Sequence, residues 1–156
     1  MDLNIGIAAN DRKDIATGLS KLLADSYSLY LKTHNYHWNV TGPQFNTLHT
    51  MFEGQYAELA PAVDEIAERI RALGALAPGG LANLAGMAGI AEIQEDASAS
   101  EMVRHLADAN KRVMADLNKA RELAGDAGDN ETEDLMIARL QVHGKTLWML
   151  ESFLEE

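Results

Sequence analysis

Long stretches of this chain carry apolar residues at spacings of three and four, the repeat that lines one face of an α-helix. The first stretch spans residues 11–38 and the second spans residues 44–73. Leucine and alanine dominate the apolar residues, β-branched residues are sparse, and the chain contains 3 prolines. Because this balance favours helix over strand, we expect an all-α fold without a β-sheet.

Glycine and proline predict where the first two helices end. Gly42 and Pro43 together stop the first helix and redirect the chain. The N-cap of this helix is expected at Asn10 or Asp11, because both side chains accept hydrogen bonds from free backbone N–H groups. Gly74 is placed to cap the C-terminus of the second helix. Helix, tight turn and helix should therefore fold into a hairpin.

A long connection separates this hairpin from two further helices. Residues 75–97 are rich in glycine and alanine, and they predict a crossover with one short helix near residues 81–86. Two capping boxes predict the start of the third and fourth helices: Ser98 with Glu101, and Asn130 with Glu133. This connectivity predicts a ferritin-like four-helix bundle with a long crossover between helices two and three, although other bundles with one crossover would also fit.

Size and composition limit the kind of protein. A length of 156 residues suits a single domain over residues 1–156, with residues 1–10 as an N-terminal tail. No apolar stretch approaches the ~20 residues of a membrane span, so we expect a cytoplasmic protein without membrane contact. The formal net charge of −11 repels nucleic acid and attracts cations, but it also suits a merely soluble protein.

A metal, if bound, must use histidine and carboxylate ligands, because the chain contains 0 cysteines and thiolates are therefore excluded. Many ferritin-like proteins hold metals inside the bundle through Glu-x-x-His motifs. The sequence contains no such motif, and the nearest pattern, Glu101 to His105, has one residue too many. We therefore expect any metal to bind outside the bundle interior.

The second helix carries four candidate ligands suited to iron: His49, Glu53, Asp64 and Glu68. At about 100° per residue they share one face, yet His49 and Asp64 stand roughly 22 Å apart along the axis. An antiparallel second copy solves the problem, because a two-fold axis near position ~58.5 places His49 beside Glu68 and Glu53 beside Asp64. The simpler alternative is an ordinary solvated helix face. His37, at the end of the first helix, favours the metal site by offering another nitrogen.

Several short motifs around this face occur in a fixed order. They are His37-Trp38-Asn39-Val40-Thr41-Gly42-Pro43, Phe45, Leu48-His49, Phe52-Glu53, Asp64-Glu65-Ile66-Ala67-Glu68-Arg69-Ile70, Leu73-Gly74, Lys145 and Leu147-Trp148-Met149-Leu150-Glu151. The combination resembles the signature of the Dps family, the miniferritins or DNA-binding proteins from starved cells. The resemblance extends over essentially the whole chain.

The resemblance implies a hollow dodecamer with ferroxidase sites at two-fold interfaces between subunits. The implied ligands are His37, His49 and Glu53 from one subunit, with Asp64 and Glu68 from its neighbour. Many members have Asp where this chain has Glu53, and the longer side chain leaves open whether each site binds one iron or two.

The function implied by the resemblance is iron storage and detoxification. Such proteins oxidise Fe(II), with hydrogen peroxide preferred over dioxygen, and store ferric mineral, which protects DNA and the cell from oxidative damage. A second hypothesis is a structural or nucleoid-associated shell whose metal sites are weak or occupied by zinc, which accepts the same ligands. A third is a monomeric helical bundle with an unrelated function.

Further residues have alternative interpretations. Trp38 is either an electron donor or radical trap beside the site, or an aromatic packed at an interface. His34 is either a transient iron binder or an ordinary surface or interface histidine. The resemblance implies that Asp129 and Asp134 line a pore for Fe(II), whereas both also suit a helix N-terminus. His105 and His143 receive no role.

Direct DNA binding is not expected. Several family members bind DNA through a lysine-rich terminus that contacts phosphates. Here residues 1–10 contain no lysine or arginine, and the last two residues are Glu155 and Glu156.

Overall fold

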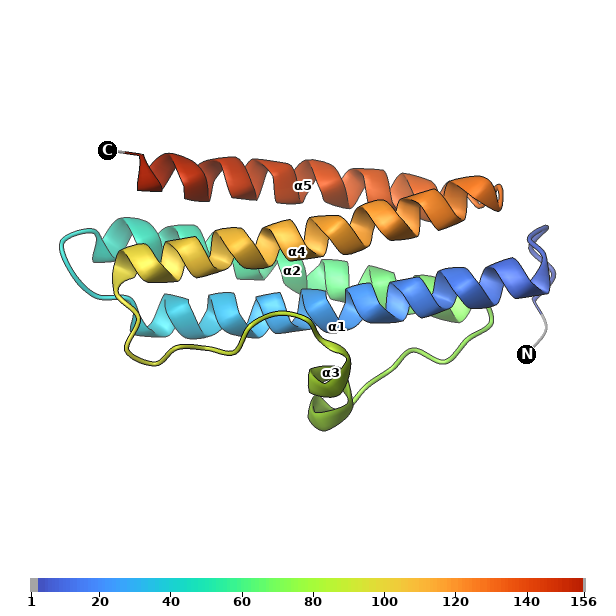
Figure 1. Ribbon diagram of the computed structural model, residues 1–156, viewed down its shortest axis with the longest axis horizontal. Coiled ribbons are helices and arrows are strands. Elements are labelled where there is room, and N and C mark those ends of the chain that lie inside the picture. The colour runs from blue at the N-terminus through green and yellow to red at the C-terminus, as the bar shows by residue number, and fades with distance from the viewer. Residues whose placement is uncertain (1–2, 156) are drawn as a thin grey trace.

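The computed structural model describes residues 3–155, which form five helices and no strand (Figure 1). Four long helices lie side by side along the molecule, and a short helix lies outside them. The helices are α1 Ala9–Asn39, α2 Phe45–Ala72, α3 Leu81–Met87, α4 Ala99–Asp126 and α5 Asn130–Leu154. The predicted all-α bundle, with a long crossover and one short helix in it, is confirmed.

The core lies where the apolar faces of the long helices meet. α1 packs against both α2 and α4, α4 also packs against α5, and the contact between α2 and α5 is sparse. The largest fully buried side chains include Leu19, Leu22, Phe52, Ile66, Leu106 and Leu117. Burying a side chain of this size stabilises the fold by about 1.5–3 kcal/mol. The three- and four-residue spacing read from the sequence therefore marks the core faces correctly.

The predicted end of α2 is confirmed at Gly74. Its φ of 93° lies in the left-handed region that glycine adopts without steric cost. The N–H of Gly74 donates to the carbonyl of Arg71, and the N–H of Ala75 donates to that of Ile70, which together make a Schellman motif. Pro61 lies inside α2, and the helix runs unbroken past it.

Of the predicted N-terminal caps, only one stands as expected. Ser98 and Glu101 form the complete capping box at the start of α4. For α1 the prediction was wrong, because the N-cap is Ala8, two to three residues earlier than expected, and it makes no side-chain cap. The guanidinium of Arg12 instead donates to the carbonyls of Leu3 and Ile7. This contact orders part of the expected N-terminal tail, of which residues 1–2 lie outside the described range.

At α5 the cap is Asp129 rather than the expected Asn130 with Glu133. The Asp129 carboxylate accepts from the backbone N–H and the hydroxyl of Thr132 and from Arg69 on α2. A guanidinium 60 residues away in sequence thus selects the capping residue, so no local pattern could have predicted it.

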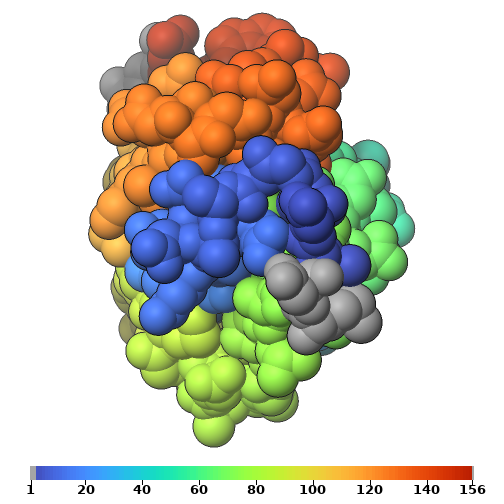
Figure 2. Space-filling view, turned by 90° about the vertical axis from the view of Figure 1, so that its right-hand side faces the viewer, coloured from blue at the N-terminus to red at the C-terminus, as the bar shows by residue number. Residues whose placement is uncertain are grey.

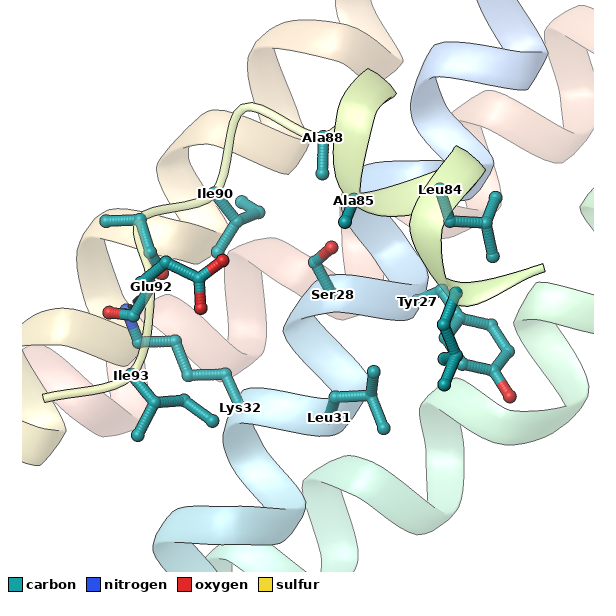
Figure 3. A pocket seen from close by; sticks show the side chains of 12 residues that line it. Tyr27, Ser28, Leu31, Lys32, Leu84, Ala85, Ala88, Ile90, Glu92 and Ile93 are labelled. Carbon is teal, nitrogen blue, oxygen red and sulfur yellow. Dashed lines mark hydrogen bonds between the residues drawn. The ribbon is translucent and has the colours of Figure 1, made fainter. Parts of the chain in front are cut away.

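The crossover is held against the bundle by two buried charges of α1. Lys32 Nζ donates to the carbonyl of Ala91 at 2.9 Å, and the Asp25 carboxylate accepts from the backbone N–H of Gly89. Between α1, α3 and the crossover lies a cavity of about 160 Å³, whose lining residues are drawn in Figure 3. Seen end-on in Figure 2, the start of α1 lies between the α4–α5 turn and the crossover.

The described helices differ from membrane-spanning helices. None of them combines the length and the apolar composition that a membrane span requires.

Candidate metal site at the α1–α2 hairpin

The hairpin places His37 and His49 face to face. His37 lies in the last turn of α1, and His49 lies at the start of α2. The two imidazole rings stack with centroids 3.7 Å apart and an interplanar angle of 18°. His37 is buried and His49 is half-buried. The expectation that helix one folds against helix two is therefore confirmed, and it brings His37 next to His49. That both nitrogens bind one metal site stays a prediction.

Each of these histidines is oriented by the backbone of the other. His37 Nδ1 lies 2.8 Å from the carbonyl oxygen of His49, and His49 Nδ1 lies 2.8 Å from that of His37. A carbonyl oxygen only accepts, so both Nδ1 atoms carry the proton. Both Nε2 atoms therefore keep a lone pair when the rings are neutral. A hydrogen bond on the other ring nitrogen is the usual support of a metal-binding imidazole.

The local fold explains why a carbonyl is free for this contact. The last four carbonyls of a helix lack an intrahelical partner. His37 lies two residues before the end of α1 at Asn39, and its carbonyl is bound by the His49 ring. The hairpin turn thus both ends the helix and creates the acceptor that fixes His49.

The predicted carboxylates lie on α2 and are exposed. Glu53, Asp64 and Glu68 all face solvent, and none of them makes an ion pair within the part of the chain that the structure describes. Because α2 is continuous, Asp64 stands roughly 22 Å from His49 along the axis.

One chain alone does not assemble a metal site. Among residues 3–155, no group of three or more His, Asp or Glu side chains is placed to hold an ion. Of the five predicted ligands, the structure brings together His37 and His49 and leaves the carboxylates apart. The single chain therefore offers only part of a metal site. It has two oriented imidazole nitrogens at the hairpin and exposed carboxylates on α2.

An aromatic cluster adjoins the histidine pair, and of its members Tyr56 was not predicted from the sequence. His34 packs between Trp38, with centroids 4.0 Å apart, and Tyr56, at 4.3 Å. Tyr56 also meets His37 edge-on at 5.1 Å. Trp38 is 62% exposed in the single chain. Tyr56 lies two helical turns after His49, and this i, i+7 spacing was the signal that could have found it.

Asp129 and Asp134 differ sharply in the structure. Asp129 is fully buried, caps α5 and pairs with Arg69 at 2.6 Å. Because its oxygens are already bound by protein donors, it does not line a pore, and that expectation is wrong for this residue. Asp134 is exposed, and its role at a pore stays a prediction. His105, to which no role was given, lies 2.8 Å from the Tyr36 hydroxyl through Nδ1.

Comparison with known proteins places the chain in a family. A ferritin-like domain model matches residues 16–156. A DNA protection during starvation protein of Bacillus anthracis is 37% identical over 147 residues, covering 92% of this chain and 99% of that protein. A Dps protein from Vibrio cholerae, described as a member of the ferritin-like diiron-carboxylate proteins, superposes with a TM-score of 0.94 at 31% identity, covering 98% of this chain and 96% of the other. A Dps protein from Bacillus brevis gives a TM-score of 0.90 at 37% identity, with coverage of 94% and 98%. The chain belongs to the Dps family of ferritin-like proteins.

Proposed function

We propose that this protein oxidises Fe(II) at sites shared between two copies of the chain. His37, His49 and Glu53 of one copy would bind the substrate iron together with Asp64 and Glu68 of a second, antiparallel copy. The observation that carries the proposal is the reciprocal orientation of the two imidazoles, because it leaves a lone pair on Nε2 of each of two neighbouring, oriented rings. The exposed carboxylates of α2, which make no ion pair with any residue in the range 3–155, would supply the oxygen ligands that each histidine pair lacks.

The ligand set suits the oxidation of iron. Imidazole nitrogens accept Fe(II), and carboxylates offset the extra positive charge of Fe(III) and so favour the oxidised ion. Hydrogen peroxide needs two electrons and two protons to become two water molecules, and two Fe(II) ions supply both electrons. Where Glu53 limits the site to one iron, Trp38, which follows His37 in the sequence and packs against His34, would supply the second electron.

The wider function we propose is iron storage and detoxification. A homo-oligomeric cage, a dodecamer by family resemblance, would keep ferric mineral in its hollow interior within the cytoplasm. The named relatives are DNA protection during starvation proteins, and removal of Fe(II) and peroxide would protect DNA without contact. Direct DNA binding is not part of the proposal, because the net charge is −11 and like charges repel.

The alternative is a structural or nucleoid-associated shell that holds zinc or little metal. Stacked histidines with nearby carboxylates also suit Zn²⁺, which has no redox chemistry. Such a shell would assemble normally but would not consume peroxide when Fe(II) is added.

Anaerobic Fe(II) titration followed by hydrogen peroxide distinguishes the two functions. We expect the unaltered protein to oxidise Fe(II) rapidly. We expect His37→Ala/His49→Ala to assemble normally but to lose this rate by about 100-fold or more, because loss of metal ligands removes the bound substrate. His105→Gln is the matched control and should keep the rate, since His105 lies on α4 and its ring binds the Tyr36 hydroxyl. Fast oxidation in the double variant would remove these histidines from the mechanism.

A further inference from the structure

A polar cluster joins α2, α4 and α5, and the proposed iron site does not use it. It consists of Glu58 on α2, Asn110 on α4, and Arg139 and His143 on α5, all near the middle of their helices. Asn110, Arg139 and His143 are buried, with 2%, 5% and 3% of their surface exposed, while Glu58 has 40% of its side chain exposed. We call these four residues the interior cluster.

The guanidinium of Arg139 occupies the centre of the interior cluster. It donates to both carboxylate oxygens of Glu58 as a two-pronged pair, with Nη2 3.0 Å from Oε2. The same Nη2 lies 3.0 Å from Nε2 of His143. Because a guanidinium only donates, Nε2 of His143 must be the accepting nitrogen.

The other side of the His143 ring confirms this proton arrangement. Its Nδ1 lies 2.9 Å from Oδ1 of Asn110, while the Asn110 amide nitrogen donates to the carbonyl of Leu106 at 2.8 Å. His143 Nδ1 therefore carries the proton. Burial, with the charge of Arg139, lowers the pKa of His143 to about 3, so the ring stays neutral at physiological pH.

A carboxylate and a neutral Nε2 lone pair, with Nδ1 held by an amide oxygen, form the donor set of a transition-metal site. Ferritin-like bundles that bind metal internally use inward-facing carboxylates and histidines on facing helices. Here those donors converge on a side-chain cation instead. The adjoining cavity is about 10 Å³, room for at most one water molecule, and Arg139 already occupies both carboxylate oxygens and the Nε2 lone pair.

We infer that the Arg139 guanidinium takes the place of a metal ion inside this bundle, occupying the carboxylate and imidazole that would otherwise bind a divalent transition metal. Arginine keeps its charge at every accessible pH and matches a carboxylate with two parallel hydrogen bonds. Being covalently attached, it cannot be released to solvent as an ion can. The interior is thereby closed to metal, and iron is confined to the histidine pair, a consequence that rests on the proposed function.

Cobalt binding tests this inference without reading iron oxidation. The background is His37→Ala/His49→Ala, which removes the histidine pair of the α1–α2 hairpin, and Co²⁺ is followed by equilibrium dialysis and visible absorption. Adding Arg139→Ala should create about one new Co²⁺ site per chain, because an imidazole and a carboxylate lose their cation. Further replacement of His143 by alanine should abolish that site. Methylguanidinium should compete with Co²⁺ for the vacated space.

Two results would overturn the inference. An Arg139→Ala variant with unchanged helicity and oligomeric mass that binds no additional Co²⁺ contradicts it. So does a gain of Co²⁺ that survives loss of His143, because the metal would then lie elsewhere. If Arg139→Ala does not fold, Arg139→Gln replaces it, since glutamine keeps a polar group but no charge.

A measurement on the unaltered protein completes the test. With isotope-labelled histidine, added paramagnetic Co²⁺ should leave the His143 signal sharp, because Arg139 holds its Nε2. Direct broadening of His143 to the extent expected for a ligand would overturn the inference even if the proposed iron site failed. Loss of iron oxidation alone would not affect it.

Discussion

At the scale of single residues, this fold relies on buried charged groups that have defined partners. Asp25 of α1, which is fully buried, illustrates this together with the neighbouring carboxyl of Asp116 on α4, whose side chain is 12% exposed. Burial alone would raise the pKa of Asp25, but hydrogen bonds from Asp116, Lys21 and the N–H of Gly89 outweigh it and lower that pKa. Burial and the neighbouring Asp25 raise the pKa of Asp116 to about 7. Asp116 thus holds the proton of the pair.

This pair predicts a pH dependence of stability. The folded pKa of Asp116 lies above its ordinary value of 3.8, so the folded state binds more protons between these two values. The contribution of Asp116 is therefore present at low pH and is lost as pH rises towards about 7. Asp116→Asn keeps a hydrogen-bond donor at this position but has no group that titrates. We expect the variant to gain stability relative to the original as pH rises from about 5 to about 8.

Chemical denaturation at several pH values measures this effect. Asp108→Asn, on the same helix and exposed, is the matched control and should not change the pH profile. A constant stability difference across the pH range would show that the two carboxyl groups do not share a proton in the folded state.

At the scale of helices, the ends differ in what holds them. α4 begins with an exposed local box, Ser98 with Glu101, whereas α5 begins with buried Asp129, which is tied to α2 through Arg69. The second arrangement links two helices whose direct contact is otherwise sparse. Arg69 also donates to the hydroxyl of Thr132 at 2.7 Å, so one side chain fixes the first turn of α5.

Removing the partner of the α5 cap and removing the α4 cap itself should therefore reduce the stability of the fold by unequal amounts. Arg69→Ala leaves a fully buried carboxylate without its cation, and we expect a loss of about 3 kcal/mol in the free energy of unfolding. Ser98→Ala removes a cap that is exposed to water and should cost about 1 kcal/mol. Urea unfolding measures both. Equal losses would mean that the Arg69 contact adds nothing beyond an ordinary helix cap.

The difference between these caps also shows what the sequence could predict. Helix positions, the crossover and the Ser98 box follow from local spacing, because their partners lie within a few residues. The Asp129 cap and the interior cluster could not be predicted, because Arg69 and Arg139 lie 60 and 81 residues from their partners. The histidine pair was an intermediate case, since the hairpin implied proximity but not the exchange of carbonyl contacts.

At the scale of the whole molecule, the candidate ligands are divided between the two ends of α2. The single chain holds two oriented histidines at one end of α2 and two acids towards the other end, and no described residue of the same chain completes the set. An antiparallel second copy offers the missing acids at both ends at once. If the proposed function holds, enzymatic activity is a property of the assembly, and two defective copies should be able to complement each other.

Mixed assembly tests the shared site most directly. His37→Ala/His49→Ala removes the nitrogen ligands, and Asp64→Ala/Glu68→Ala removes the acids that the partner would supply. Each variant alone should oxidise Fe(II) slowly with peroxide. When the two are dissociated, mixed in equal amounts and reassembled, half of the pairs are mixed, and each mixed pair holds one intact site. About a quarter of the original activity should therefore return. No recovery, in mixtures whose co-assembly is verified by mass, would contradict a site shared between two subunits.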